Sequence, residues 1–293
     1  MLATFLLAAA TLAPTSADPS APASARRAAA DVLRTTLTGL EQEAEGSPAL
    51  PRLLAAGQTA AEALGPSQLA TTLRASLYEA RWRDVTAPGS AAEGLEQDLR
   101  RTLGDLDFEP VMEADLPEGF PAPTPVGEVE VKRYPVYRIA RADSGGTGAF
   151  WQLFQHIQKH DIPMTAPVEM TYDASGDEVD MAFMYEHAAQ GSTGPDGSVE
   201  VTDIPPMLVA SMGCRGRSTD AAVARALDAI TSWILEQDDL EIAGPVRQFG
   251  YNGPSVPSSR KYFEVQIPVR RLGDDGSTAG PAVAPAGDDV ARR

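Results

Sequence analysis

The side chains best suited to hold a metal ion or a cofactor stand together near the middle of the chain. His156 and His160 are four residues apart, a spacing that places two side chains on one face of a helix. Met164 follows four residues later, beyond Pro163. Imidazole and thioether groups are both iron ligands in proteins. Two polar histidines on a solvated helix face would have the same spacing. Because both positions lie beside the apolar stripe of the helix, we expect them to be exposed.

The helix that must carry these histidines is predicted from its apolar residues. Phe150, Leu153, Phe154 and Ile157 recur at i, i+3, i+4 and i+7, the pattern of one helix face packed against a core. Trp151 lies off this face. It is therefore the candidate for an exposed apolar contact with a ligand, although a single exposed tryptophan is also ordinary.

Four cationic residues of the predicted first strand and helix are candidates for binding the carboxylates of a ligand, because Arg and Lys pair with carboxylates. They are Lys132, Arg133, Arg138 and Lys159. Each is also consistent with ordinary surface charge. The whole chain carries 24 Lys and Arg against 41 Asp and Glu, a net charge of −17. Binding to a polyanion depends on clustered Lys and Arg, so we expect no nucleic-acid partner.

Other kinds of catalytic or metal site find little support in the sequence. The single cysteine, Cys214, excludes an intrachain disulfide and a multi-cysteine zinc site. Its place at the end of a predicted strand is typical of a small buried side chain. The glycine-rich stretch from Gly145 to Gly148 lacks the lysine of a phosphate-binding loop.

The elements around the histidines recur in a repeated order. The first unit has the strand-like segment Val129–Arg141, the helix of Phe150–Ile157, and the strand-like segments Thr165–Tyr172 and Glu178–Tyr185. The second unit has Met207–Cys214, a helix marked by Val223, Leu227, Ile230 and Ile234, and the strands Pro245–Tyr251 and Lys261–Val269. Two strand–helix–strand–strand units predict a duplicated α+β domain over residues 125–271, with a helix on each half of one antiparallel sheet. The cleft between such halves is a common place for small ligands.

The regions that flank this domain are simpler. Residues 18–106 predict three or four short amphipathic helices, an all-α region suited to packing or to binding a protein partner. These helices include Pro51–Leu64, a helix capped by Ser67, and Ala91–Leu103. Residues 107–124 are predicted to be a Pro-rich linker, because four prolines lie between Leu116 and Gly127. Residues 272–293 have almost no large apolar side chains and are predicted to be a disordered tail.

The N-terminus is typical of a secretory signal peptide over residues 1–17. An apolar run, Leu2–Ala13, is followed by the small residues Thr15-Ser16-Ala17 of a cleavage site. We therefore expect export to a periplasmic or extracellular location, and a cytoplasmic one if this segment is not a signal peptide. The apolar run is too short to span a bilayer, so we expect no stable membrane insertion.

Four short segments within residues 125–271 share their order and spacing with the motifs of one known family. They are Val129–Tyr134 (VEVKRY), Asp161–Val168 (DIPMTAPV), Phe249–Pro254 (FGYNGP) and Phe263–Pro268 (FEVQIP). The Met-Thr-Ala-Pro-Val run is the most specific of them. On these residues the domain resembles the SOUL heme-binding protein family, whereas the N-terminal helices lie outside the resemblance.

The resemblance implies a distorted antiparallel β-barrel flanked by two helices. It also implies reversible, non-enzymatic binding of heme or a related tetrapyrrole. Some members place a histidine, offered as the iron ligand, just before the tyrosine of the first strand, where this chain has Arg133. Ligation of that kind does not carry over, and the implied site is an apolar groove along the first helix. The candidate heme-binding residues are Trp151, His156, His160, Met164, Arg133, Arg138 and Lys159.

The implied architecture is also similar to that of gyrase-inhibitor-like domains, which bind hydrophobic small molecules. Some of those relatives hydrolyse strained rings with an acidic residue in the cleft. Glu264 matches that position in the closing strand, where it would act as a general acid or base if it faced the cleft. A structural carboxylate paired with a cation is the alternative. Three hypotheses follow: a tetrapyrrole-binding protein, a small-molecule hydrolase or effector-binding domain, and a protein whose helices bind a partner.

Overall fold

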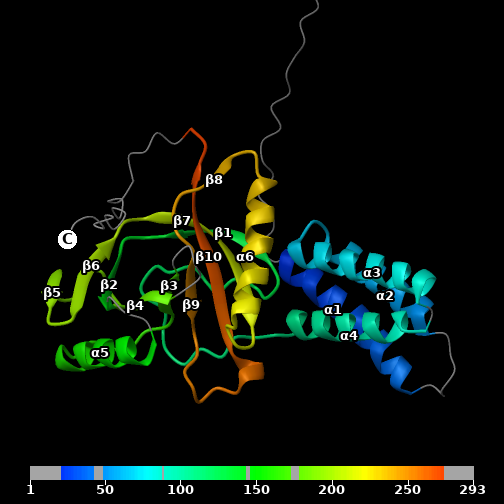
Figure 1. The fold of residues 1–293 in the computed structure, drawn as a ribbon, viewed down its shortest axis with the longest axis horizontal. Coiled ribbons are helices and arrows are strands. Elements are labelled where there is room, and N and C mark those ends of the chain that lie inside the picture. The colour runs from blue at the N-terminus through cyan, green and yellow to red at the C-terminus, as the bar shows by residue number, and fades with distance from the viewer. Residues whose placement is uncertain (1–20, 43–48, 88, 143–145, 173–177, 274–293) are drawn as a thin grey trace, which may run out of the picture. The chain divides into compact units, whose positions relative to one another are not determined.

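A computed structural model describes residues 21–42, 49–87, 89–142, 146–172 and 178–273 (Figure 1). The chain divides into two compact units. Residues up to Leu106, apart from Pro66–Thr72, form the first unit, and the rest of the chain forms the second. The predicted signal peptide lies outside the described residues, as does the predicted tail from residue 274 onward.

The first unit is helical throughout its described residues, as the sequence predicts. Its helices are α1 (Ala21–Glu41), α2 (Ala49–Leu64), α4 (Ala91–Leu106) and the part of α3 (Gln68–Thr86) that begins at Leu73. Leucines and alanines at helical spacing form its core. Ser67 caps α3, since its Oγ accepts a hydrogen bond from the backbone N of Ala70 at 3.2 Å. None of the described helices is both long and apolar enough to cross a membrane.

One glycine explains how closely two of these helices approach. Gly57 on α2 faces Leu77 on α3, and a Cβ at position 57 would lie 2.6 Å from the Leu77 Cδ2 atom. Any larger residue would therefore force the helices apart or move Leu77.

The second unit is built on one antiparallel sheet of ten strands within the described residues. These are β1 (Val129–Tyr134), β2 (Tyr137–Ala142), β3 (Val168–Tyr172), β4 (Glu178–Met184), β5 (Gly194–Asp196), β6 (Val199–Ile204), β7 (Met207–Arg215), β8 (Leu240–Ile242), β9 (Arg247–Gly250) and β10 (Tyr262–Arg271). Their order is β1-β7-β10-β9-β3-β4-β2-β6-β5, and β8 pairs with β10 beside this path. The α+β class is confirmed. The sheet does not close, so the expectation of a β-barrel is corrected: β1 and β5 end the row of strands.

The strand order confirms the predicted duplication. The set β2, α5 (Gly146–Lys159), β3 and β4 recurs as β7, α6 (Asp220–Leu235), β9 and β10. The two sets meet where β3 pairs with β9. The strand that precedes each set joins the other half, because β1 pairs with β7 and β6 pairs with β2. Strand β1 of the first repeat therefore extends the second half of the sheet, and β6, which precedes the second repeat, extends the first half, so that the two halves are tied together.

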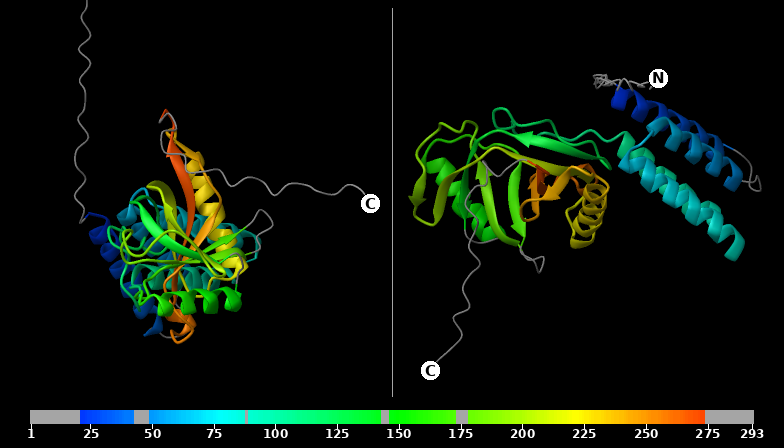
Figure 2. Two further views of the ribbon diagram at one scale, coloured as in Figure 1. Left: turned by 90° about the vertical axis from the view of Figure 1, so that its left-hand side faces the viewer. Right: turned by 90° about the horizontal axis from the view of Figure 1, so that it is seen from above.

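A helix lies on each half of the sheet. Helix α5 packs against β2, β4 and β6, whereas α6 packs mainly against β7, β8 and β10. Both views show the two helices apart, over opposite ends of the sheet (Figures 1 and 2). Thr219 caps α6, since its Oγ1 accepts a hydrogen bond from the Ala222 backbone N at 3.3 Å. After α5 the chain reverses at Asp161, which has a positive φ of 53°.

Three features of the sheet were not predicted, the smallest of which is the short strand β8. The single strand expected over Val129–Arg141 is broken at Pro135 and Val136, because proline has no N–H for the sheet ladder. The hairpin of β5 and β6 was missed altogether. Its turn contains Asp196-Gly197, with Gly197 at a φ of +67°, and Asp-Gly is a strong hairpin signal in a sequence.

Residues 107–124 are packed into the second unit and do not form a free linker. Phe120 lies edge-on to Tyr134 and Tyr137, with ring centroids 4.9 and 5.0 Å apart. Phe108 stacks on Tyr262 with its centroid 6.3 Å away. These aromatic residues belong to a core shared by strands of both halves. The prolines of the segment exclude regular structure, but they do not prevent its apolar side chains from filling the space between the repeats.

Candidate functional site

Helix α5 positions the predicted histidines, but it does not expose them equally. Leu153 and Ile157 pack against the sheet, and His156 is buried beside them with 6% of its surface exposed. The expectation that both histidines are solvent-facing is therefore wrong for His156. His160, at the end of the helix, has a side chain that is 43% exposed. The buried face of α5 extends beyond its large apolar residues, because the β5–β6 hairpin covers the side of the helix that carries His156.

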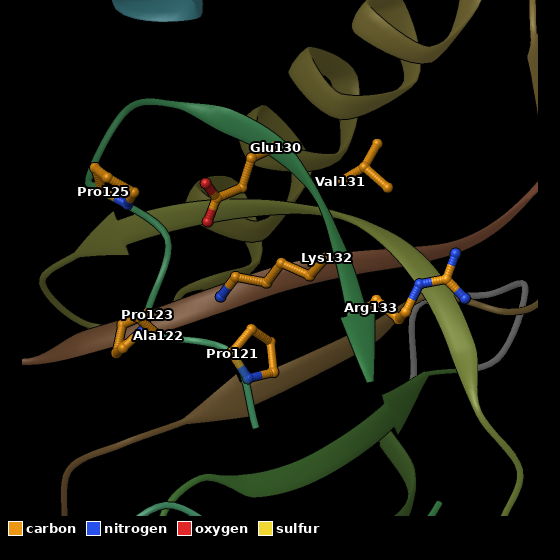
Figure 3. Close-up of a pocket in the computed structure, with 8 residues that line it drawn as sticks. All are labelled: Pro121, Ala122, Pro123, Pro125, Glu130, Val131, Lys132 and Arg133. Carbon is orange, nitrogen blue, oxygen red and sulfur yellow. The ribbon is translucent and has the colours of Figure 1, made fainter. Parts of the chain in front are cut away.

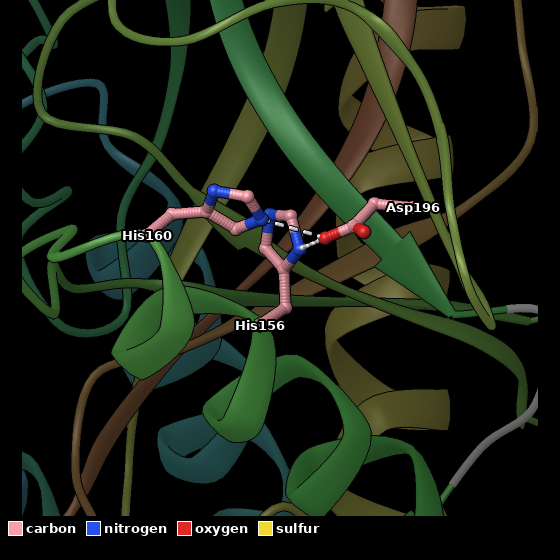
Figure 4. A group of neighbouring side chains, drawn as sticks. All are labelled: His156, His160 and Asp196. Carbon is pink, nitrogen blue, oxygen red and sulfur yellow. Dashed lines mark hydrogen bonds and ion pairs between the residues drawn. The ribbon is translucent and has the colours of Figure 1, made fainter.

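Both histidines converge on one carboxylate, Asp196 at the end of β5 (Figure 4). His156 Nδ1 lies 2.8 Å from Asp196 Oδ2, and His160 Nε2 lies 2.7 Å from the same oxygen. Lys159 Nζ donates to the other oxygen, Oδ1, at 2.6 Å. These three hydrogen bonds hold the pKa of Asp196 well below its usual range.

The inner side of His156 is held by Tyr185. The tyrosine hydroxyl is 2.7 Å from His156 Nε2. Because a carboxylate only accepts hydrogen bonds, His156 Nδ1 carries the proton toward Asp196, and the Tyr185 hydroxyl donates to Nε2. Burial lowers the pKa of His156, against the opposing effect of its hydrogen bond to Asp196. The lowered pKa favours the neutral imidazole, and the hydrogen bonds at both nitrogens orient the ring.

This cluster opens into a pocket of about 390 Å³. His156, His160, Tyr185 and Asp196 line one part of it, and the backbone of Gln190–Pro195 lines another. Ile162 and Val201 add apolar surface. The pocket thus combines nitrogen, carboxylate and phenol groups with room for a small ligand.

A second feature of α5 is an aromatic edge, defined here as Phe150, Trp151 and Phe154. The Trp151 ring stands edge-on to Phe150 and Phe154, with centroids 5.8 and 5.7 Å away. Phe150 also contacts Phe183 of β4 at 5.2 Å. Trp151 is 54% exposed, as predicted. The edge therefore joins the core at one end and presents an indole to solvent at the other.

The aromatic edge and the histidines lie on opposite sides of the buried stripe. At about 100° per residue along a helix, residues 150, 151 and 154 fall on one side of Leu153 and Ile157, and residues 156 and 160 fall on the other. The structure therefore does not bring Trp151 together with His156 and His160. Met164 lies in the loop after α5 and is 37% exposed.

Arg138 and Lys159, like the buried Lys132 that binds Glu264, are already paired within the protein. Arg138 binds both oxygens of Asp203, at 2.7 and 2.9 Å, and its Nη1 donates to the carbonyls of Gln190 and Gly191 at 2.8 Å. It therefore fastens the loop that lines the histidine pocket. Lys159 is bound to Asp196. Neither is an unengaged partner for a ligand carboxylate.

Arg133 lies elsewhere, on β1, which pairs with β7 of the second repeat. Its side chain is exposed and makes no ion pair within the described residues. It lines a shallow hollow of about 420 Å³ with Glu130, Lys132 and Pro121. Figure 3 shows Glu130 and Lys132 pointing toward the Pro121–Pro125 segment, while Arg133 points the other way. Burial raises the pKa of Glu130 at this place.

Glu264 is the centre of a closed polar network. Its side chain has no exposed surface, and Lys132 Nζ donates to its Oε1 at 2.7 Å. The Thr124 backbone N and the Tyr262 hydroxyl lie 2.6 and 2.9 Å from the same oxygen. Gln266 donates to Oε2 at 2.7 Å. The carboxylate is a buried, paired anion in this structure, and it faces no open cleft.

Residues 123–268 match the model of the SOUL heme-binding protein family, which spans half of the chain. The chain belongs to the SOUL family. The SOUL domain thus contains α5, its histidines and its aromatic edge, whereas the four N-terminal helices lie outside the matched residues. Membership supports heme or tetrapyrrole binding at the level of the family. It does not assign the residues of the site.

Solved structures with a similar arrangement are remote in sequence. They include the C-terminal domain of EcmrR, at 15% identity and a TM-score of 0.38, over 50% of this chain and 98% of that chain. A hydrolase from Listeria innocua has 10% identity and a TM-score of 0.39, over 51% and 94%. SAV2435 bound to tetraphenylphosphonium has 15% identity and a TM-score of 0.30, over 49% and 94%. No curated protein matches the chain. These likenesses carry no argument about what the SOUL domain binds.

The two residues that organise the histidines were not predicted from the sequence. Asp196 and Tyr185 are 40 and 29 residues from His156 along the chain. The Asp196-Gly197 pair does signal a hairpin. No spacing rule, however, places that hairpin against α5, because the contact depends on how β6 joins β2 in the sheet.

Proposed function

We propose that the SOUL domain binds heme or a related tetrapyrrole reversibly and without catalysis. The aromatic edge of α5 is the proposed contact surface. The observation that carries this proposal is the exposure of Trp151 between two other aromatic rings, on a domain of a heme-binding family. Exposure of clustered aromatic side chains to water is unfavourable, so such clusters commonly mark binding surfaces.

The residues of this edge fit a flat apolar macrocycle. Aromatic rings stack on one another at centroid separations of about 4.5–7 Å, and Trp151 offers the largest exposed face on α5. A bound tetrapyrrole would supply a planar apolar surface with carboxylate substituents. The side chains of Trp151 and Phe154 would bury one face of the macrocycle. Arg133 is not assigned to its carboxylates, because β1 lies at the opposite end of the strand order from the strands that α5 covers.

Iron ligation by the histidines is not required in this proposal. Both ring nitrogens of His156 are hydrogen-bonded, and His160 is bonded to Asp196. An axial bond would have to replace one of these interactions. Apolar burial on the aromatic edge is therefore expected to supply most of the affinity.

A hemin titration of the full chain, followed through the Soret band, tests the proposal. Trp151→Ala is expected to raise the Kd about tenfold, equivalent to about 1.4 kcal/mol, because the macrocycle loses its aromatic face. Trp82→Ala is the matched control, since Trp82 is 62% exposed but belongs to α3. His160→Ala is expected to change the Kd by less than tenfold.

Three results would count against this assignment. An equal loss in Trp82→Ala would show that the effect is nonspecific. A loss above a hundredfold in His160→Ala would mean that iron ligation dominates. No binding at micromolar hemin would leave the SOUL domain without a tetrapyrrole function in this protein.

The hydrolase or effector-binding alternative is not favoured by the geometry. It needs Glu264 at an open cleft, where a substrate can reach the carboxylate. The four donors around Glu264 and the packing of residues 107–124 leave no exposed carboxylate surface.

We also propose a protein-binding role for the N-terminal helices. Tyr78, Trp82 and Val85 on α3 are 72%, 62% and 78% exposed. Their spacing of i, i+4 and i+7 aligns them along one face of the helix. Self-association of the full chain, measured by light scattering, should weaken in Trp82→Glu if this face binds a second copy. A monomer at all concentrations would point to a different partner.

Export remains a proposal that rests on residues 1–17. Cleavage after Ala17 would produce a mature protein that begins at Asp18. N-terminal sequencing of the secreted or periplasmic fraction tests this, and intact Met1 recovered from the cytosol would contradict it.

A further inference from the structure

Three potential metal ligands from two distant parts of the chain meet at the mouth of the histidine pocket. The ligand atoms of His156, His160 and Asp196 all lie within 4.8 Å of one another. Figure 4 shows the two imidazoles rising from consecutive turns of α5 toward the carboxylate. The histidine rings have centroids 4.8 Å apart. Helical spacing of i and i+4 is an effective way to present two imidazoles to one ion.

The surroundings of the cluster resemble those of a built metal site. Metal-bound histidines usually form a hydrogen bond through the second ring nitrogen, which fixes the ring and its tautomer. His156 has such a partner in Tyr185. If Nδ1 binds an ion, the imidazole proton moves to Nε2. The Tyr185 hydroxyl oxygen can then accept a hydrogen bond from Nε2–H, because a hydroxyl both donates and accepts hydrogen bonds. Lys159 holds Asp196 Oδ1, so Oδ2 is available as a single ligand.

We propose that His156, His160 and Asp196 bind a divalent first-row transition metal ion of the zinc type. Two imidazoles and one carboxylate are the ligand set of open zinc sites and of other sites with free positions. Nitrogen ligands disfavour calcium and magnesium, which prefer oxygen. The free position of the ion would face the pocket of about 390 Å³, where a small ligand or water can reach it.

Binding requires a small, local rearrangement. Zinc bonds of about 2.0–2.1 Å in a tetrahedron place ligand atoms about 3.3 Å apart. In the present structure the carboxylate oxygen is 2.7–2.8 Å from the two nitrogens, in hydrogen-bond contact. Asp196 would therefore retreat slightly as the ion replaces both hydrogen bonds, and the two imidazole nitrogens, which lie within 4.8 Å of each other, would move to about 3.3 Å. The residue lies at the tip of the β5–β6 hairpin, and its side chain is 28% exposed.

Calorimetric titration of the full chain with zinc chloride tests the site, using EDTA-treated protein without an affinity tag. We expect one equivalent of zinc per chain. His160→Ala and Asp196→Asn should each raise the Kd at least tenfold. Both positions are partly exposed, so these variants are expected to fold, unlike a change at buried His156. Cobalt(II) in place of zinc should give a visible absorption band that is lost in the same variants.

Two control variants separate this site from other zinc ligands. His187 lies outside the cluster, against Glu118 and Glu186, so His187→Ala should keep the wild-type affinity. Cys214→Ser should keep it as well. No saturable binding, an unchanged affinity in either cluster variant, or a loss in either control would overturn the proposal. Because hemin is absent from every titration, the result is independent of the tetrapyrrole proposal.

Discussion

Two carboxylates of the SOUL domain, Glu264 and Asp196, are each surrounded by donors but lie in opposite environments. Glu264 is sealed inside the sheet, with an ammonium, an amide, a backbone N–H and a phenol around it. Asp196 lies at the tip of a hairpin, where two imidazoles and an ammonium meet it at the mouth of a pocket. A ligand cannot reach the enclosed Glu264, whereas a ligand in the pocket can contact Asp196 directly.

A buried charged group can bind a ligand only if the ligand can reach it and can replace the hydrogen-bond donors around it. Removing Lys132 leaves the buried charge of Glu264 unpaired, and removing a neutral donor leaves one of its hydrogen bonds unmade, and both losses are costly. Two of the three donors to Asp196, Lys159 and His160, are partly exposed, so an ion can replace the hydrogen bonds of this carboxylate at lower cost. We therefore assign Glu264 to stability and the Asp196 cluster to binding. Three experiments test how the buried and the exposed carboxylates of the domain differ in their contribution to stability.

The largest effect is expected from removing residues 107–124, which cover Glu264. A fragment of residues 125–273 loses the Thr124 N–H and the packed side chains of Phe108 and Phe120. Each lost aromatic side chain is worth about 1.5–3 kcal/mol, so the total is comparable to the stability of a whole domain. We expect no cooperative thermal transition in circular dichroism.

The fragment of residues 107–273 is the control, because it keeps the covering segment. It should unfold cooperatively. Similar melting temperatures for the two fragments would show that residues 107–124 are the dispensable linker that their prolines suggest.

A smaller loss is expected from Lys132→Ala, which leaves Glu264 buried without its cation. The expected destabilisation is about 3–5 kcal/mol in urea unfolding. The double change Lys132→Met with Glu264→Gln removes both charges and should cost much less than the sum of the single changes. Additive losses would mean that the two groups act independently and that the pair is not the centre of the network.

The smallest effect is expected at the pocket rim, from Asp203→Asn. Arg138 lowers the pKa of Asp203 below its ordinary value of 3.8. The unfolded carboxyl therefore binds protons at a higher pH than the folded one. The stabilisation is complete above pH 3.8 and is lost as the pH falls through the folded-state pKa.

Because the Asp203 side chain is 40% exposed, the variant should lose only about 1 kcal/mol at pH 7. Thermal melts at several acidic pH values measure the difference in stability between the wild-type protein and the variant. This difference should become smaller below pH 3.8. If the difference in stability does not change with pH, the charge of Asp203 is not its cause.

Most of the architecture could be predicted from local patterns, whereas burial at the site could not. The repeated apolar spacing around Leu153 and Ile230 predicts both helices of the SOUL domain, and alternation predicts most of the long strands. His156 was placed on the surface because its position lies beside the apolar stripe. It is buried because a hairpin that starts 35 residues after Lys159 folds against that side of the helix.

The sequence by itself determined the helical and strand segments, the duplication, the family, and the residue types from which a site can be made. These follow from periodicity, turn residues and short motifs, which are local properties of the chain. Only the tertiary structure decided that Glu264 is sealed, that residues 107–124 cover it, and that Asp196 joins His156 and His160. Those outcomes depend on strand exchange between the repeats, which brings together residues that no local spacing relates.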